Sequence, residues 1–130
     1  MASPKPIDFP HADWQSKRND NAVGIEVRLM MQNAHLLIAE LRFQPQASFD
    51  AHSAPWDCHV LCLAGSGFVL VGEETFPIAQ GQSVFWPQKV LHQMWTTDNA
   101  MHTQMIEHVH QVADPRAAWQ QHVAEQGASA

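Results

Sequence analysis

Hydrophobic and polar residues alternate along most of the chain, with short segments of aliphatic and β-branched residues that end at glycine, proline or asparagine. A period of two residues is typical of half-buried β-strands. The pattern predicts strands at residues 23–32, 36–44, 58–65 and 67–72, two within 73–87, and one each at 90–99 and 101–112.

Two breaks in this pattern are interpreted from proline and glycine. Pro45 is predicted to end the second strand, because proline has no N–H to donate to a strand ladder. The Gly-Ser-Gly sequence at residues 65–67 indicates a hairpin turn between two apolar strands. Residues 1–22 are rich in proline, aspartate and asparagine without a period, so we expect an extended arm.

The period changes at the C-terminal end. Asp114 is a favourable helix cap, Pro115 suits a first helical position, and Gly127 suits a helix end. We therefore expect one short helix within residues 113–130, with Trp119 and Val123 on one face. Many short strands followed by one helix predict an all-β barrel or sandwich over residues 23–112, and the chain length fits one domain.

The charge balance argues against polyanionic partners. The 130 residues carry a formal net charge of −6, only 15% of them are charged, and no basic run occurs. Binding to nucleic acid or to an anionic membrane requires clustered cations, so we expect neither partner. No apolar stretch approaches the roughly 20 residues of a membrane span, and the first residues lack a signal-peptide pattern. The prediction is a cytoplasmic protein.

The two cysteines fit a reducing compartment. Cys58 and Cys62 lie four residues apart on one predicted strand face, which places their Cα atoms about 13 Å apart. A disulfide requires less than about 7 Å, so these cysteines do not pair within one chain. Free thiols are usual in the cytoplasm.

A motif near residue 90 resembles the second conserved motif of the cupins. Gly81, Pro87 and His92 stand at the family spacing. Lys89 stands where the family has glycine, and Thr96 stands where it has asparagine.

The first cupin motif is matched less completely. His52 and Gly65 fit, and fifteen residues separate the two motifs, which is usual for a small cupin. Gln46 replaces the opening glycine, Ala54 the second histidine, and Cys58 the glutamate. The resemblance covers roughly residues 20–112 and implies a double-stranded β-helix, the jelly-roll barrel of the cupins, and a homodimer.

The resemblance also implies a metal site, because a typical cupin metal is held by three histidines and one glutamate. His52 and His92 are retained, and Cys58 occupies the glutamate position as a candidate third ligand or as an ordinary buried residue. The cofactor would be a divalent ion of iron, zinc, nickel or manganese. Alternative third ligands are the histidines of the last predicted strand, His102, His108 and His110.

Strand alternation predicts the pocket around these ligands. Residues two apart share a face, so His59 should point away from Cys58. The expected wall is mostly apolar and suits a small apolar or aromatic ligand with one polar group. The same residues could simply fill the core of a small barrel. The predicted pocket residues are Val60, Cys62, Phe68, Trp86 and Met94.

Three functions are compatible with this sequence. The first is a metal-dependent enzyme, an oxygenase or isomerase, built on His52 and His92. The second is a non-catalytic protein that binds a small organic molecule as a sensor or carrier. The third is a structural cupin without a ligand, in which Trp95 and Trp119 would serve a subunit interface.

Overall fold

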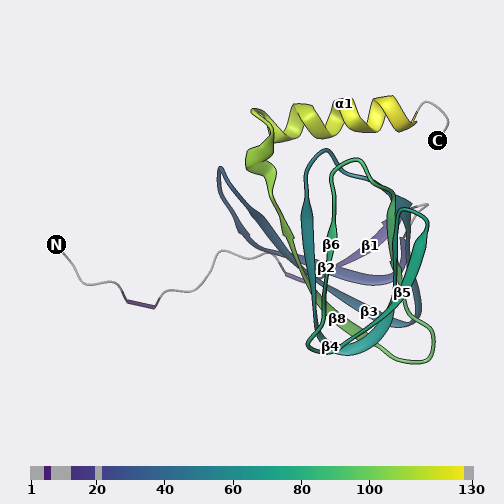
Figure 1. Cartoon of the computed structure of the whole chain (residues 1–130). Helices are drawn as coiled ribbons and strands as arrows, with labels where there is room; N and C mark the ends of the chain where they lie inside the picture. The colour runs from purple at the N-terminus through teal and green to yellow at the C-terminus, as the bar shows by residue number, and fades with distance from the viewer. Residues whose placement is uncertain (1–4, 7–12, 20–21, 128–130) are drawn as a thin grey trace.

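A computed structural model describes residues 5–6, 13–19 and 22–127 of the chain. The described part forms a strand-rich jelly-roll barrel, and a helix lies across one end of it (Figure 1). The elements are β1 (Gln15–Asn19), β2 (Ala22–Gln32), β3 (Leu37–His52), β4 (Cys58–Val71), β5 (Glu74–Ala79), β6 (Ser83–Trp86), β7 (His92–Trp95), β8 (Met101–Glu107), a 3-10 turn (Val109–Gln111) and α1 (Pro115–Gly127).

Two long strands, β3 and β4, connect the different parts of the single eight-stranded sheet that forms the barrel. The first half of β4, residues 58–65, pairs with β6 and β8, and its second half, residues 66–71, pairs with β5 and β7. Strand β3 pairs with β8 through residues 37–43 and with β7 from Ser48 onward, and β2 lies along its other edge. Both strands thus change pairing partners along their length, and all pairs among the described strands are antiparallel.

The predicted hairpin at residues 65–67 is wrong, because β4 continues through this sequence without a turn. The two glycines instead permit close backbone contacts. A Cβ atom on Gly65, where φ is +77°, would lie 2.0 Å from the Ala100 carbonyl oxygen, and one on Gly67 would lie 2.6 Å from the Trp95 carbonyl oxygen. Glycine is required at these two positions because the neighbouring backbone leaves no room for a Cβ atom, and not because the chain reverses direction.

The predicted strand end at Pro45 is also wrong, since β3 continues to His52. Between Phe43 and Ser48 the partner of β3 changes from β8 to β7, and the buried Thr96 side chain bonds the backbone of this segment. Thr96 Oγ1 donates a hydrogen bond to the Gln44 carbonyl oxygen and accepts one from the Ala47 N–H at 3.0 Å. Pro45 therefore lies at the corner where β3 leaves one neighbour and joins the next.

Among the described residues, two that are not glycine have a left-handed backbone. Gln46 has φ of 61° and Lys89 has φ of 63°. These are the two positions at which cupin motifs carry glycine and this sequence does not. The backbone conformation is thus retained here without the residue type that adopts it most easily.

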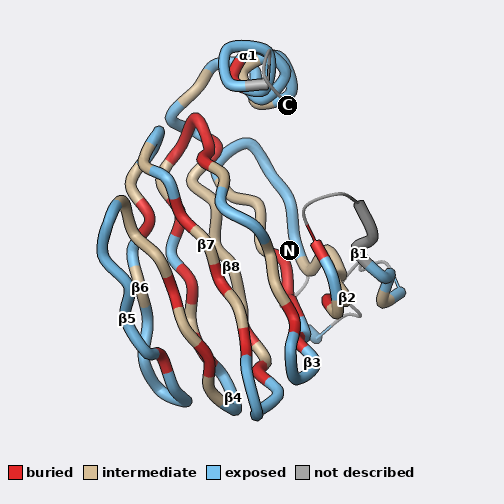
Figure 2. The backbone as a smooth tube through the Cα atoms, turned by 90° about the vertical axis from the view of Figure 1, so that its right-hand side faces the viewer, coloured by how far each residue is buried: buried red, intermediate tan, exposed pale blue. Residues whose placement is uncertain are grey.

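Alternate residues of the strands fill the interior. Figure 2 shows buried positions interleaved with exposed ones along the strands. The core contains Ile25, Leu41, Phe43, Val69 and Ile78, together with most of the inward residues of β4 and β7. Close packing of this kind supplies most of the favourable free energy of a small barrel.

The N-terminal segment contributes a strand to this sheet. Within the predicted arm, β1 pairs with β2, whereas residues 1–4, 7–12, 20 and 21 lie outside the described residues. The Trp14 ring lies 3.7 Å from Cζ of Arg42 and 4.6 Å from Cζ of Arg28, both on the outer face of the sheet. Cation–π contacts of this kind hold the segment against the barrel.

The C-terminal helix begins as predicted. Asp114 Oδ1 accepts a hydrogen bond from the Ala117 N–H at 3.2 Å, so Asp114 caps α1. Trp119 stacks on Trp56 with 5.9 Å between ring centroids, and His122 Nε2 lies 3.0 Å from Ser53 Oγ. These two contacts fix α1 over the barrel end. Among the described helices, none has the length and hydrophobicity needed to cross a bilayer.

We predict that Lys89→Gly stabilises the protein. The exposed Lys89 has a left-handed backbone, which costs an L-residue about 1–2 kcal/mol, whereas added glycine flexibility costs about 0.5–1 kcal/mol. The free energy of unfolding should rise by about 0.5–1 kcal/mol in urea denaturation. The control is Gln88→Gly, next in the chain and without a positive φ, which should destabilise. A similar loss in both variants would contradict this account.

Candidate binding pocket

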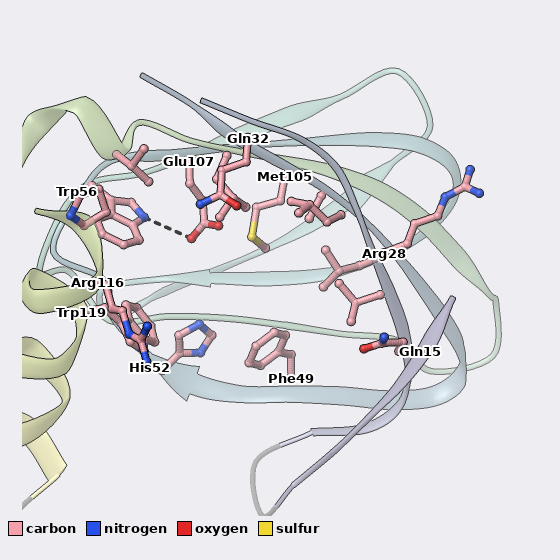
Figure 3. Close-up of a pocket in the computed structure, with 17 residues that line it drawn as sticks. Gln15, Arg28, Gln32, Phe49, His52, Trp56, Met105, Glu107, Arg116 and Trp119 are labelled. Atoms are coloured by element: carbon pink, nitrogen blue, oxygen red, sulfur yellow. Dashed lines mark hydrogen bonds between the residues drawn. The ribbon is translucent and has the colours of Figure 1, made fainter. Parts of the chain in front are cut away.

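A cavity of about 650 Å³ opens between β2, β3, β8 and the start of α1. Figure 3 shows its side chains converging from the strands on one side and the helix on the other. The wall is mostly aliphatic, with two tryptophans, one phenylalanine and a few polar groups among its lining residues. The aliphatic wall consists of Val27, Leu29, Leu37, Leu41, Met105 and Val109.

A carboxylate lies on the wall of this cavity. Glu107 ends β8, and its Oε1 accepts a hydrogen bond from Trp56 Nε1–H at 3.1 Å (Figure 3). Its inward position follows from the register, because Glu107 pairs with the buried Cys58 of β4. The indole thus holds the carboxylate in a fixed place beside the cavity.

A row of stacked rings runs from the cavity into the core. Phe49 and His52 line the cavity and stack with 4.5 Å between their ring centroids. His52 meets His92 edge to face, also at 4.5 Å, and His92 lies flat on Trp86 at 4.0 Å. His52 and His92 are brought together as the motif predicts, because they are register partners in β3 and β7.

The two histidines differ in their surroundings. His52 is half-buried, and its Nδ1 lies 2.8 Å from the Asp50 carbonyl oxygen. His92 is 3% exposed, and its Nδ1 has no hydrogen-bond partner among the described residues. Burial first, and the neighbouring His52 second, lower the pKa of His92 to about 3, and the backbone of Val90 opposes this shift only in part. His92 is therefore a neutral imidazole at physiological pH.

Cys58 is close to the carboxylate but is an inert thiol. It lies between Trp86 on β6 and Glu107 on β8 and is 2% exposed. Burial, and then the negative charge of Glu107, raise the pKa of the Cys58 thiol far above its usual range. A neutral thiol is a poor nucleophile and a poor metal ligand.

The comparisons with known proteins agree with this barrel. The family model for the cupin domain matches residues 39–109, which is more than half of the chain. The chain belongs to the cupin family. A search of the curated proteins found no significant match.

Solved structures show the same fold at low identity. The polyketide cyclase RemF from Streptomyces resistomycificus is 17% identical with a TM-score of 0.67, covering 83% of this cupin and 79% of its own chain. A cupin-like protein from Thermotoga maritima is 20% identical with a TM-score of 0.67, covering 79% and 81%. A cupin-2 domain from Rhodospirillum rubrum is 13% identical with a TM-score of 0.69, covering 88% and 76%. These likenesses show the fold alone.

The donor set of this cupin does not fit a tightly bound metal. The described residues contain no group of three histidine, cysteine or carboxylate side chains arranged to hold an ion. Ala54 is buried against Trp56 and Val109, so the position of the missing histidine is packed with apolar groups. Two imidazoles without a third protein donor hold a divalent ion weakly.

None of the alternative histidines supplies the third donor. His102 faces the outer side of the sheet, where its Nε2 meets Glu40. Strand β8 ends at Glu107, so His108 and His110 lie beyond it rather than on it, contrary to the predicted strand. His108 Nε2 lies 2.8 Å from Nδ1 of His59, which is exposed and lies on the opposite strand face from the buried Cys58, as alternation predicts.

Most of the predicted pocket residues belong to the core instead. The cavity lining includes His52 but none of the other predicted site residues. Phe68 faces outward, stacks on Trp95, and lines a separate hollow of about 330 Å³. The residues packed in the core are Cys58, Val60, Cys62, Trp86 and Met94.

Sequence reasoning missed Glu107 and Trp56, whose hydrogen bond holds a carboxylate on the cavity wall. For Glu107, the sequence signal that could have indicated an inward side chain is the alternation of residues on the last strand. Met101 and Thr103 are buried on the same face as Glu107, whereas His102 lies on the other face. An inward face of that composition places the carboxylate, rather than the histidines, inside the barrel.

We predict a pH dependence of stability that arises from His92. Because its pKa is about 3 in the folded protein and 6.5 otherwise, the unfolded chain takes up the proton first as the pH falls. Above pH about 6.5 the neutral His92 therefore costs no stability. Below that pH the free energy of unfolding decreases, by up to about 1.4 kcal/mol per pH unit.

The measurement is urea unfolding at pH 7.5 and 5.0 for the wild type and His92→Phe, which keeps a ring on Trp86. The wild type should lose about 2 kcal/mol more than the variant over this interval. Equal losses would show that His92 is not held neutral.

Proposed function

We propose that this cupin binds a small, planar, largely apolar organic molecule in the cavity between β2, β3, β8 and α1. The observation that carries the proposal is the cavity itself, about 650 Å³ with apolar walls and a carboxylate held in place by an indole. Binding sites for small molecules have this size and this mixture of apolar surface with a few fixed polar groups.

The aromatic side chains support a planar ligand. Phe49 and His52 form one stacked pair on the wall, and Trp56 and Trp119 form a second pair where α1 meets the barrel. Flat rings offer large contact areas at low entropic cost, and a planar molecule buries most surface against them. The polyketide cyclase named among the structural neighbours is consistent with a pocket for such molecules in this fold.

We predict that the neutral dye N-phenyl-1-naphthylamine binds one site per chain with an increase in fluorescence, and that Ala39→Trp abolishes binding. Ala39 lines the cavity, so the added ring occupies the space that the dye would fill. Ala124→Trp, which adds the same ring on the exposed face of α1, is the control and should bind like the wild type. Unchanged binding in Ala39→Trp would place the dye elsewhere.

The alternative is a metal-dependent oxygenase or isomerase centred on His52 and His92. The adjacency of the two imidazoles and the partnerless Nδ1 of His92 among the described residues favour it. With two protein donors, such an ion would depend on a bound ligand or water for the rest of its coordination.

Elemental analysis of untagged protein, purified without chelator, separates the two functions. We expect iron, zinc, nickel and manganese well below one per chain, with no difference between wild type, His52→Ala and His92→Ala. Near-stoichiometric metal in the wild type that is lost in both variants would establish the metal-dependent alternative. The expected homodimer and cytoplasmic location stay predictions.

A further inference from the structure

A row of mostly apolar side chains crosses the outer face of the sheet. The register aligns one outward residue from each of β2, β3, β8, β4 and β6, so the row is about 19 Å long at the usual strand spacing of about 4.8 Å. Its two end residues, Met31 and Phe85, are 39% and 44% exposed. The first outer row consists, in order, of Met31, Ile38, Ile106, His59 and Phe85.

The N-terminal segment packs against another part of this face. The Trp14 ring lies over Arg28 and Arg42, and it meets His102 edge to face with 6.0 Å between ring centroids. The charged end of the face is thus packed by the chain itself, whereas the ends of the first outer row are exposed. A continuous apolar stripe of this kind is typical of a protein interface, because its removal from water is favourable.

A second outer row lies beside the first, and its formal charges cancel. It contains one cation and one anion, and Arg28 Nη2 donates to Glu40 Oε1 at 3.0 Å. The whole chain has a formal net charge of −6, so two copies repel one another over most of their surface. A second copy can approach these two rows without that repulsion. The second outer row consists of Arg28, Glu40, Gln104, Leu61 and Ser83.

The first outer row is complementary to a second copy of itself. Its central residue, Ile106, lies on β8, with two strands on either side. A two-fold axis that runs parallel to the strands, between two copies of β8, places Ile106 on Ile106 and Phe85 of each copy on Met31 of the other. A flexible thioether packs favourably against an aromatic ring.

The same axis opposes no like charges in the second outer row. It sets Arg28 opposite Ser83 and Glu40 opposite Leu61 of the second copy. A two-fold axis along the rows would bring only the first row into contact, whereas a stable interface buries about 800 Å² on each partner. The axis parallel to the strands is therefore the one that uses both rows.

We propose that this outer face is the interface of a homodimer in which two copies pack sheet against sheet, with Phe85 of each copy on Met31 of the other. Sheets packed face to face lie about 10 Å apart, a distance that side chains of this size bridge. The interface does not include Trp95 or Trp119. The inference goes beyond the proposed function, because the ligand cavity lies on the inner side of the same strands.

Sedimentation velocity of the full chain at concentrations up to about 100 μM measures the association. The wild type should dimerise. Met31→Glu and Phe85→Lys should each weaken dimerisation about tenfold or more, because each places an unpaired charge at two points of the symmetric interface. The matched control is Phe76→Lys on β5, where the same residue type is also 44% exposed, and it should dimerise like the wild type.

Two double variants test the pairing across the axis. In Met31→Glu/Phe85→Lys, each glutamate meets a lysine of the other copy, so dimerisation should return to within about threefold of the wild type. Met31→Glu/Phe85→Glu sets like charges against one another and should stay monomeric. Circular dichroism and thermal unfolding establish that each variant is folded.

Four results would overturn the proposal. They are a wild-type monomer at every concentration, a dimer that Met31→Glu and Phe85→Lys leave unchanged, an equal loss in Phe76→Lys, and equal weakening in both double variants. None of them affects the proposed function, which the dye titration tests separately.

Discussion

The register of β4 is the constraint on which the rest of the structure depends. One strand pairs with four others, and its first residue, Cys58, lies opposite both Trp86 and Glu107. This arrangement requires the strand to pass Ala100 and Trp95 without side chains at Gly65 and Gly67. A shift by one residue would exchange the inner and outer faces of β4 and bring exposed residues such as His59 into the core in place of Cys58.

Two kinds of chemistry therefore lie side by side in the barrel. The row of rings from Phe49 to Trp86 includes a neutral, buried His92, which is packed between His52 and Trp86. On the next wall, a carboxylate and an indole face open space. The substitutions at Ala54 and Cys58 remove donors from the first region, while Glu107 gives the second a charge. This arrangement supports the proposed organic-ligand pocket more than a metal centre.

The sequence predicted most of the strand-forming segments, the helix with its Asp114 cap, and the meeting of His52 with His92, because alternation and motif spacing are local. It missed β1 within the predicted arm and the continuity of β3 and β4. It could not distinguish a hairpin from a close crossing at residues 65–67, since glycine permits both. Alternation separates Glu107 from His102 on the two faces of β8, but pairing with β3 and β4 decides which of these faces is inward. The sequence also could not predict that Trp119 lines the cavity, because this depends on where α1 packs, and tertiary contacts such as the stacking on Trp56 determine that position.

The most direct test of the central claim is a crystal structure of protein purified without chelator, with anomalous diffraction recorded at the absorption edges of iron, nickel and zinc. The account predicts an open cavity with the Trp56 indole on the Glu107 carboxylate, His92 flat on Trp86, and no anomalous peak between the two imidazoles. An anomalous peak coordinated by His52 and His92, with Glu107 or Cys58 moved toward it, would contradict an organic-ligand pocket and establish a metal centre.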